Sequence, residues 1–126
     1  MPFPYTVDDG LLSADVPVII RPPGYTRTYP AELHLTAKLD TGAAFSAIHD
    51  MTLFGLSDVE LIRHQKLSGF GGSFTAGVYA VSLEFHGQIL DYVEIVAVPR
   101  LGCVIGMNSM VQHVIEFNGP GGHFTL

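Results

Sequence analysis

The stretch AKLDTGAAFSAI, residues Ala37–Ile48, carries the strongest indication of the fold. Its first residues complete a segment, 31–39, in which alanine or leucine alternates with polar residues, the period of a half-buried β-strand. This strand leads directly into Asp40, Thr41 and Gly42. A carboxylate between apolar stretches loses part of its hydration. We therefore expect Asp40 to be a partly desolvated acid at the end of a strand.

Taken alone, the tripeptide Asp40–Gly42 is also typical of an ordinary turn. Thr41 can hydrogen-bond to nearby backbone, and Gly42 allows a tight bend that brings amide groups near the carboxylate. A second segment favours a more specific interpretation. The glycine-rich sequence GFGG at 69–72 predicts the tip of a β-hairpin that spans residues 65–85.

Short strands and turns account for most of the remaining chain. We predict further strands at 16–21, 89–98, 114–117 and 123–126, and short helices at 50–56, capped by Asp50, and at 106–113. Many short strands with one or two short helices indicate an all-β fold, a small closed or partly closed β-barrel. A chain of 126 residues has the size of one domain. We expect residues 1–15 to be a loosely ordered segment and residues 16–126 to form the domain.

Composition and charge restrict the partners. Hydrophobic residues make up 48% of the chain and charged residues 14%, which favours an ordered domain. The net charge is −6, and the six lysines and arginines form no run, so we expect neither nucleic acid nor membrane as a partner. Residues 1–15 lack the features of a signal peptide or anchor. The single Cys103 cannot form an internal disulfide, and we expect it to be a small buried hydrophobic residue. We therefore expect a cytoplasmic protein whose partner is a peptide or a small molecule.

Together and in this order, these segments resemble the retropepsin-type aspartic peptidases, especially their compact single-domain bacterial relatives. The resemblance extends from about Val16 to Leu126. It combines the Asp-Thr-Gly-Ala loop within 37–48, the glycine-rich hairpin at the position of the family's flap, the segment VIGMNSM at 104–110 that leads into the C-terminal helix, and the closing hairpin at 115–126. The resemblance implies a small β-barrel of the acid-protease type and a peptide or protein substrate.

The resemblance also implies an aspartic endopeptidase with Asp40 as its catalytic carboxylate. Hydrolysis by this chemistry uses two carboxylates that share a proton, one as the base toward water and the other as the acid toward the departing amide. The sequence contains one such motif, so we expect the second carboxylate to be Asp40 of a second copy in a homodimer. In the resemblance Thr41 braces the two loops against each other and Gly42 sets the loop geometry. The mechanism needs no cofactor and no metal.

In this family the flap is a hairpin that closes over an extended peptide and excludes water. The resemblance therefore implies that the loop and the flap supply the substrate contacts, namely Ala43, Gly69, Phe70, Gly71, Gly72, Ser73 and Phe74. An alternative stays open for the aromatic residues, because Phe70, Phe74 and Tyr79 can simply pack the hairpin.

Two residues depart from the family pattern. Lys38 lies two positions before Asp40, on the same face of the strand, where the family has an apolar residue. It can shape a subsite for an acidic side chain, or its long stem can extend into solvent. Met107 replaces the arginine that commonly follows this glycine in the family. These departures keep an alternative open, a noncatalytic module of the same fold that dimerises or binds peptides.

Other chemistries have weaker support in the sequence. The six histidines include no pair four residues apart and have no accompanying cysteine cluster, so we predict no metal site. Ser46 and Ser68 lack the surroundings of an activated nucleophile. The segment 69–72 lacks the Lys-Ser/Thr ending of a phosphate-binding loop.

Overall fold

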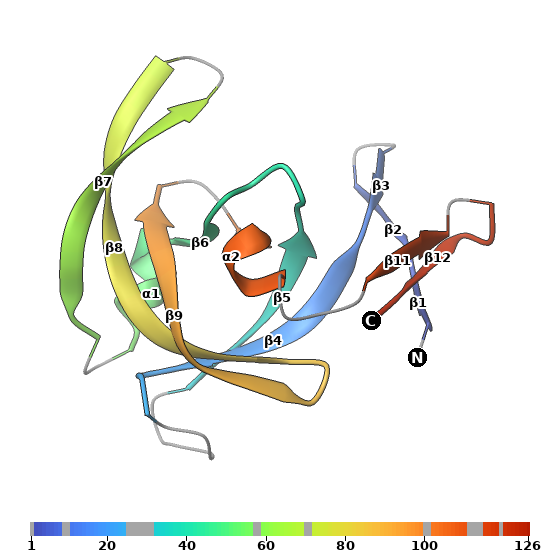
Figure 1. The fold of residues 1–126 in the computed structure, drawn as a ribbon, viewed down its shortest axis with the longest axis horizontal. Coiled ribbons are helices and arrows are strands. Elements are labelled where there is room, and N and C mark those ends of the chain that lie inside the picture. Colours follow the sequence, from blue (N-terminus) through green and yellow to red (C-terminus); the bar gives the residue numbers. More distant parts are fainter. Residues whose placement is uncertain are drawn as a thin grey trace.

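The computed structural model describes residues 2–8, 11–24, 32–56, 59–69, 72–99, 102–110, 115–118 and 120–126, and most of them lie in β-strands (Figure 1). The strands are β1 (Pro2–Pro4), β2 (Thr6–Asp8), β3 (Leu11–Ser13), β4 (Asp15–Arg21), β5 (Leu33–Leu39), β6 (Ser46–His49), β7 (Leu61–Gly69), β8 (Gly72–Phe85), β9 (Gln88–Val98), β10 (Cys103–Ile105), β11 (Glu116–Asn118) and β12 (His123–Thr125). Among the described residues there are two short helices, α1 (Asp50–Leu53) and α2 (Met107–Met110).

Six strands close into a β-barrel in the order β4-β5-β10-β6-β9-β8. The ring closes because β4 pairs with β8 as well as with β5: Val18 of β4 lies opposite Leu35 of β5 and opposite Phe85 of β8. Closure pairs backbone groups that an open sheet would leave at its edges. The predicted all-β barrel with short helices is therefore confirmed.

Strands β7 and β8 form a hairpin, as predicted from the glycine-rich segment. The last residues of β8, 82–85, pair with β4 in the barrel, whereas its first residues, 72–76, pair with β7 but not with β9. The far end of the hairpin therefore extends beyond the barrel, as Figure 1 shows. β7 begins at Leu61, four residues before the predicted start at Gln65. The pairing shifts register between Leu61 and Arg63, and this irregularity hid the start of the strand from the sequence pattern.

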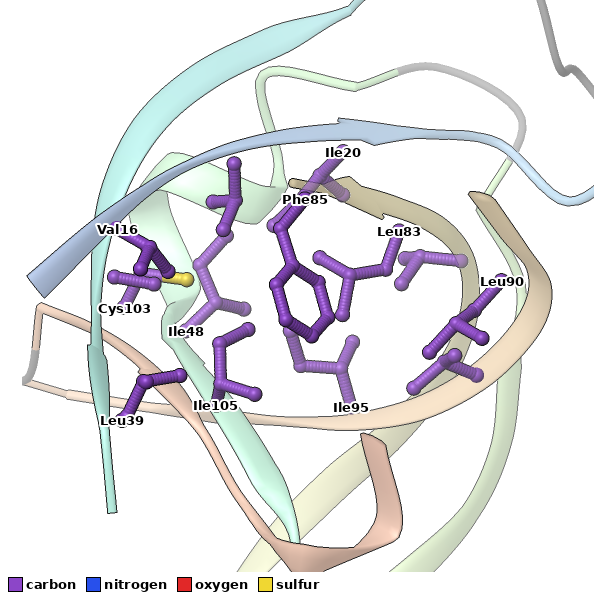
Figure 2. Packing of buried hydrophobic residues seen from close by; sticks show 14 of the residues in the cluster. Val16, Ile20, Leu39, Ile48, Leu83, Phe85, Leu90, Ile95, Cys103 and Ile105 are labelled. Carbon is purple, nitrogen blue, oxygen red and sulfur yellow. The ribbon is translucent and has the colours of Figure 1, made fainter. Parts of the chain in front are cut away.

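The core cluster is mostly aliphatic, and Figure 2 shows the ring of Phe85 among these side chains. The cluster's largest fully buried aliphatic residues are Ile20, Ile48, Leu53, Leu83, Ile95 and Ile105. The main core cluster as a whole takes residues from all six barrel strands and from α1.

Two sequence predictions concern this core directly. On β5 the predicted alternation is confirmed, since Ala37 and Leu39 are buried whereas the intervening Lys38 is exposed. Cys103 is buried in the core, as predicted for a small hydrophobe, and burial raises the pKa of its thiol to about 12. The thiol therefore stays protonated at neutral pH.

A second, three-stranded sheet brings both ends of the chain together in the order β1-β12-β11. Phe3 stacks on Phe124 with ring centroids 5.3 Å apart, and Phe124 is fully buried in the core cluster. The predicted closing hairpin is present as β11 and β12. We expected residues 1–15 to be loosely ordered, but residues 2–8 and 11–13 contain three short strands. The sequence pattern does not predict β1, because β1 pairs with β12 at the other end of the chain and such a pairing leaves no local pattern.

Helix α1 begins immediately after β6, and its N-cap is His49 rather than the predicted Asp50. The backbone of His49 is still extended (φ −60°, ψ 129°), and its Nδ1 accepts a hydrogen bond from the Met51 N–H at 3.1 Å. Asp50 Oδ1 accepts from the same N–H at 2.7 Å, so both side chains serve the helix start. Helix α2 begins at Met107, and its predicted end at His113 lies outside the described residues.

Candidate active site

Asp40 directly follows β5, and backbone hydrogen bonds hold it in place. Its N–H donates to the Ile105 carbonyl oxygen at 3.0 Å, which ties the loop to β10. The Gly42 N–H donates to Asp40 Oδ1 at 2.8 Å, and the Ala43 N–H donates to the Asp40 carbonyl oxygen at 3.2 Å. A Cβ on Gly42 would lie 3.2 Å from the same Oδ1. The backbone of the loop therefore orients the Asp40 carboxylate, and Gly42 lies where the backbone comes closest to it.

Strand β10 lies between β5 and β6, parallel to the first and antiparallel to the second. The loop that connects β5 to β6 must therefore pass the end of β10, where helix α2 begins. The Met107 N–H donates to the Ala43 carbonyl oxygen at 2.7 Å. A Cβ on Gly106 would overlap the Phe45 carbonyl group and lie 2.9 Å from the Ala43 carbonyl oxygen. Glycine at this position lets the loop and α2 pack backbone to backbone.

A buried polar network supports the loop from below, and the sequence did not predict it. Ser46 and Ser109 are fully buried, and their Oγ atoms lie 2.7 Å apart. Asn108 Oδ1 accepts from the Ser46 N–H at 2.8 Å, and Asn108 Nδ2 donates to the Glu94 carbonyl oxygen at 2.7 Å. The Gly106 N–H donates to Ser46 Oγ at 3.0 Å. Ser46 is thus a structural hydrogen-bonding residue, and a serine within the apolar run at 45–48 was its signal in the sequence.

The side chain of Asp40 is exposed in the single chain, which corrects our expectation of a partly desolvated acid. Thr41 and Gly42 are also exposed, and Ala43 is half-buried. The loop packs its backbone against β10 and α2, and none of the described residues covers the Asp40 side chain. The three predicted catalytic residues therefore lie together in one anchored, exposed loop.

An apolar hollow of about 560 Å³ separates this loop from the β7–β8 hairpin. Its lining consists mostly of apolar residues from the loop, β6, both hairpin strands and β9: Gly42, Ala43, Ala44, Phe45, Ala47, Lys66, Leu67, Ser68, Phe74, Val96, Val98 and Pro99. Its size and apolar lining suit the side chain of a peptide or a small ligand. We refer to it as the loop–hairpin hollow.

A second hollow, of about 420 Å³, has Asp40 among its lining residues. It is lined by Asp15, Thr36, Lys38, Asp40, Gly102, Cys103 and Val104. Lys38 and Asp40 thus border the same hollow, in agreement with their predicted common face. Both carboxylate oxygens of Asp15 accept hydrogen bonds, from Thr6 Oγ1 at 2.6 Å and from Ser13 Oγ at 2.7 Å.

The predicted substrate-binding residues are only partly brought together. Ala43 and Phe74 line the loop–hairpin hollow, and Phe74 is 48% exposed rather than packed inside the hairpin. Gly69, Gly72 and Ser73 lie near the hairpin tip but do not line that hollow, and Phe70 and Gly71 lie outside the described residues. Tyr79 instead packs against the core cluster, and its ring is in edge contact with the Phe54 ring, with centroids 6.3 Å apart. The lining residues that sequence reasoning missed come from β7, β9, the loop and β6, and they include Lys66, Leu67, Val96, Val98, Ala44, Phe45 and Ala47.

A metal centre has no support among the residues that the structure describes, since they contain no group of three or more His, Cys, Asp or Glu side chains placed to hold an ion. The described part of the chain also contains no helix that is long and apolar enough to cross a membrane.

A scan against models of protein families finds no match to this chain, and a search of curated proteins finds no significant match. The function of the protein is therefore inferred from its fold and from the geometry of the Asp40 loop.

Proposed function

We propose that this protein is an aspartic endopeptidase of the retropepsin-like type, in which Asp40 of two identical chains forms the catalytic dyad. The observation that carries the proposal is the placement of Asp40. It is an exposed carboxylate, oriented by the Gly42 N–H, in a loop anchored to β10 and α2 and bordered by an apolar hollow. A peptidase of this class needs a fixed, accessible acid beside a cleft that accepts a peptide.

The chemistry follows from placing two such carboxylates side by side. Like charges about 3 Å apart cannot both ionise easily, so the pair shares one proton. The ionised carboxylate accepts a proton from water while the water oxygen attacks the peptide carbonyl carbon. The protonated carboxylate then donates its proton to the amide nitrogen as the C–N bond breaks. We expect activity at acidic to mildly acidic pH, where the pair holds a single proton.

The second carboxylate comes, in this proposal, from Asp40 of a second chain. Asp15 borders a hollow together with Asp40, but its two oxygens are already engaged by the hydroxyls of Thr6 and Ser13. Asp40 and Thr41 are exposed and leave a surface that a second copy can cover. In the dimer, Thr41 of each chain braces the two Asp40 loops against each other. The second chain covers the Asp40 carboxylates and excludes the water that surrounds Asp40 in the single chain.

The β7–β8 hairpin acts as the flap in this proposal. It extends beyond the barrel and shares the walls of the loop–hairpin hollow with the Asp40 loop. Gly72, at the start of β8, has a φ of +115°, a conformation that favours glycine, and it gives the tip its backbone freedom. An extended peptide can pair with such a hairpin through its backbone, and closure excludes water from the dyad.

A noncatalytic module that dimerises or binds peptides is the second candidate. Lys38 favours it, because a lysine borders the same hollow as Asp40 where the family pattern has an apolar residue. Both candidates bind peptides in the cleft. They differ in whether the bound peptide is cleaved.

The test compares the wild-type protein with Asp40→Asn and Asp15→Asn on a diverse peptide pool, between about pH 4 and pH 7, with products identified by mass spectrometry. All three proteins are matched for dimer content by size-exclusion chromatography. We expect the wild type and Asp15→Asn to cleave the same bonds and Asp40→Asn to cleave none. Equal cleavage by the wild type and Asp40→Asn, or no cleavage by the wild type, rejects the peptidase and leaves the binding module.

We also propose a reducing, cytoplasmic setting. The support is the cysteine usage, because the single Cys103 is buried in the core with a thiol whose pKa is raised to about 12. Such a thiol forms no disulfide in the folded chain and contributes to packing only. Fractionation of cells that express the protein with a small tag checks this setting.

A further inference from the structure

The loop–hairpin hollow combines an apolar wall with one charged residue. Val96 and Val98 of β9 are buried and belong to a small apolar cluster that Phe45 and Leu67 pack against. All four border the hollow, so an apolar side chain is the favoured occupant. Among the lining residues, all of which the structure describes, Lys66 is the one with a charged side chain.

The ammonium group of Lys66 makes no hydrogen bond or ion pair with any residue in the described part of the chain. Other basic residues there are engaged: Arg21 pairs with two glutamates at 2.8 and 2.9 Å, and Arg63 pairs with Glu94 at 2.8 Å. The chain has twelve acidic residues against six basic ones, so carboxylates are available to pair with a lysine. A lysine without such a partner at the edge of an apolar hollow can bind an anionic group that a ligand brings.

Lys66 borders the hollow from the edge strand β7. Its side chain starts on the opposite face of β7 from Leu67, so its long, flexible stem can bring the charge round the edge of the strand to the apolar wall. Lys66 lies opposite Thr75 in the β7–β8 ladder, and the next pair, Leu67 and Phe74, also borders the hollow. Neighbouring residues of an extended peptide are about 3.3 Å apart along the strand, with side chains on alternate faces. A peptide with an apolar side chain in the hollow therefore brings its next one or two residues within reach of a long, flexible lysine side chain.

Building on the proposed peptidase, we infer that Lys66 is a specificity-determining residue that selects substrates with a carboxylate one or two residues away from an apolar side chain held in the hollow. The carboxylate can belong to an aspartate or glutamate side chain or to the free C-terminus of a peptide. These sources share one chemistry, and amidated and free-acid versions of each peptide distinguish them.

The experiment uses peptides with one leucine as the apolar anchor and Glu, Gln or Lys at each of the neighbouring positions in turn. The proteins are the wild type, Lys66→Gln, Lys66→Glu and the control Gln88→Glu. Gln88 is exposed next to the β8–β9 turn and does not line the hollow, and its substitution lowers the net charge by one, as Lys66→Gln does. Values of kcat/KM are measured for cleavage, and the same peptides are titrated by fluorescence anisotropy against each protein carrying the additional change Asp40→Asn.

For the wild type and Gln88→Glu we expect kcat/KM to be about fivefold higher for the best Glu peptide than for its Gln counterpart, as for a favourable ion pair at a partly exposed site. The ratio falls to about one in Lys66→Gln, and Lys66→Glu prefers the Lys peptide. An unchanged ratio in Lys66→Gln, an equal loss in Gln88→Glu, or a wild type without preference overturns the inference.

The binding measurement separates this inference from the proposed function. If no protein cleaves any peptide, but the Glu peptide binds more tightly and loses this advantage in Lys66→Gln, the peptidase is rejected and the role of Lys66 stands for a binding module. If no peptide is cleaved and none binds, the role of Lys66 is rejected as well.

Discussion

Replacing Ser46 with alanine tests whether the buried polar network supports the Asp40 loop. Ser46 is fully buried, and its Oγ accepts from the Gly106 N–H at 3.0 Å and lies 3.0 Å from Asn108 Oδ1 and 2.7 Å from Ser109 Oγ. Alanine leaves the Gly106 N–H without this acceptor, which costs about 1–3 kcal/mol, and removes two hydroxyl contacts worth about 0.5–1.5 kcal/mol each. Because the neighbouring groups can rearrange, we expect the free energy of unfolding to fall by about 2–4 kcal/mol.

Ser82 provides a matched control in the same barrel. It is a buried serine on β8 whose Oγ has no hydrogen-bond partner among the residues that the structure describes. Ser82→Ala removes an unpaired polar atom from the interior, so we expect a change between zero and about 1 kcal/mol in favour of the folded state. Urea unfolding followed by circular dichroism measures both variants. If Ser46→Ala destabilises the protein no more than Ser82→Ala does, the network does not support the loop and the reasoning is refuted.

Three further substitutions test other parts of the structure. Gly106→Ala, whose Cβ would overlap the Phe45 carbonyl group, should lower the free energy of unfolding by about 2 kcal/mol or more in urea, and a neutral result would contradict the close packing of loop and α2. Phe85→Ala should cost about 3–5 kcal/mol in thermal unfolding, because it empties the centre of the core. The hydrogen bond from Arg63 lowers the pKa of Glu94, so this pair stabilises the protein at neutral pH and loses its effect as the pH falls through the lowered pKa. Glu94→Gln should therefore be slightly destabilising near pH 7, and its difference from the wild type should disappear as the pH falls through the lowered pKa of Glu94, as followed by urea unfolding at each pH.

Local patterns in the sequence predicted the barrel well. The alternation that ends at Leu39, the apolar strand 89–98 and the glycines at 69–72 each specify their element through neighbouring residues, and the structure has a strand or hairpin at each. The composition of the loop after Leu39 also placed Asp40 and Gly42 correctly in one turn, because a glycine two residues after an acid can donate its N–H to that acid.

Features that depend on distant contacts could not be predicted in the same way. The pairing of β1 with β12 joins the two ends of the sequence, and neither strand is long enough to show a period. The bonds between Ser46 and Asn108 join residues 62 positions apart in the sequence, so no local pattern marks them. The exposure of Asp40 was misjudged for a related reason: apolar neighbours in the sequence suggested burial, whereas its surroundings in space are the edge of an open hollow.

Mixing wild-type chains with Asp40→Asn chains examines whether Asp40 works as a pair across two molecules. The total protein concentration is held constant, the chains are allowed to exchange, and peptide cleavage is followed as the fraction of wild-type chains decreases. If both acids of a dimer are needed, equal amounts of the two chains should leave roughly one quarter of the wild-type activity, since random pairing gives about one dimer in four with two Asp40 residues. Activity of about one half, in direct proportion to the wild-type fraction, would show that each chain acts alone and would contradict the shared dyad.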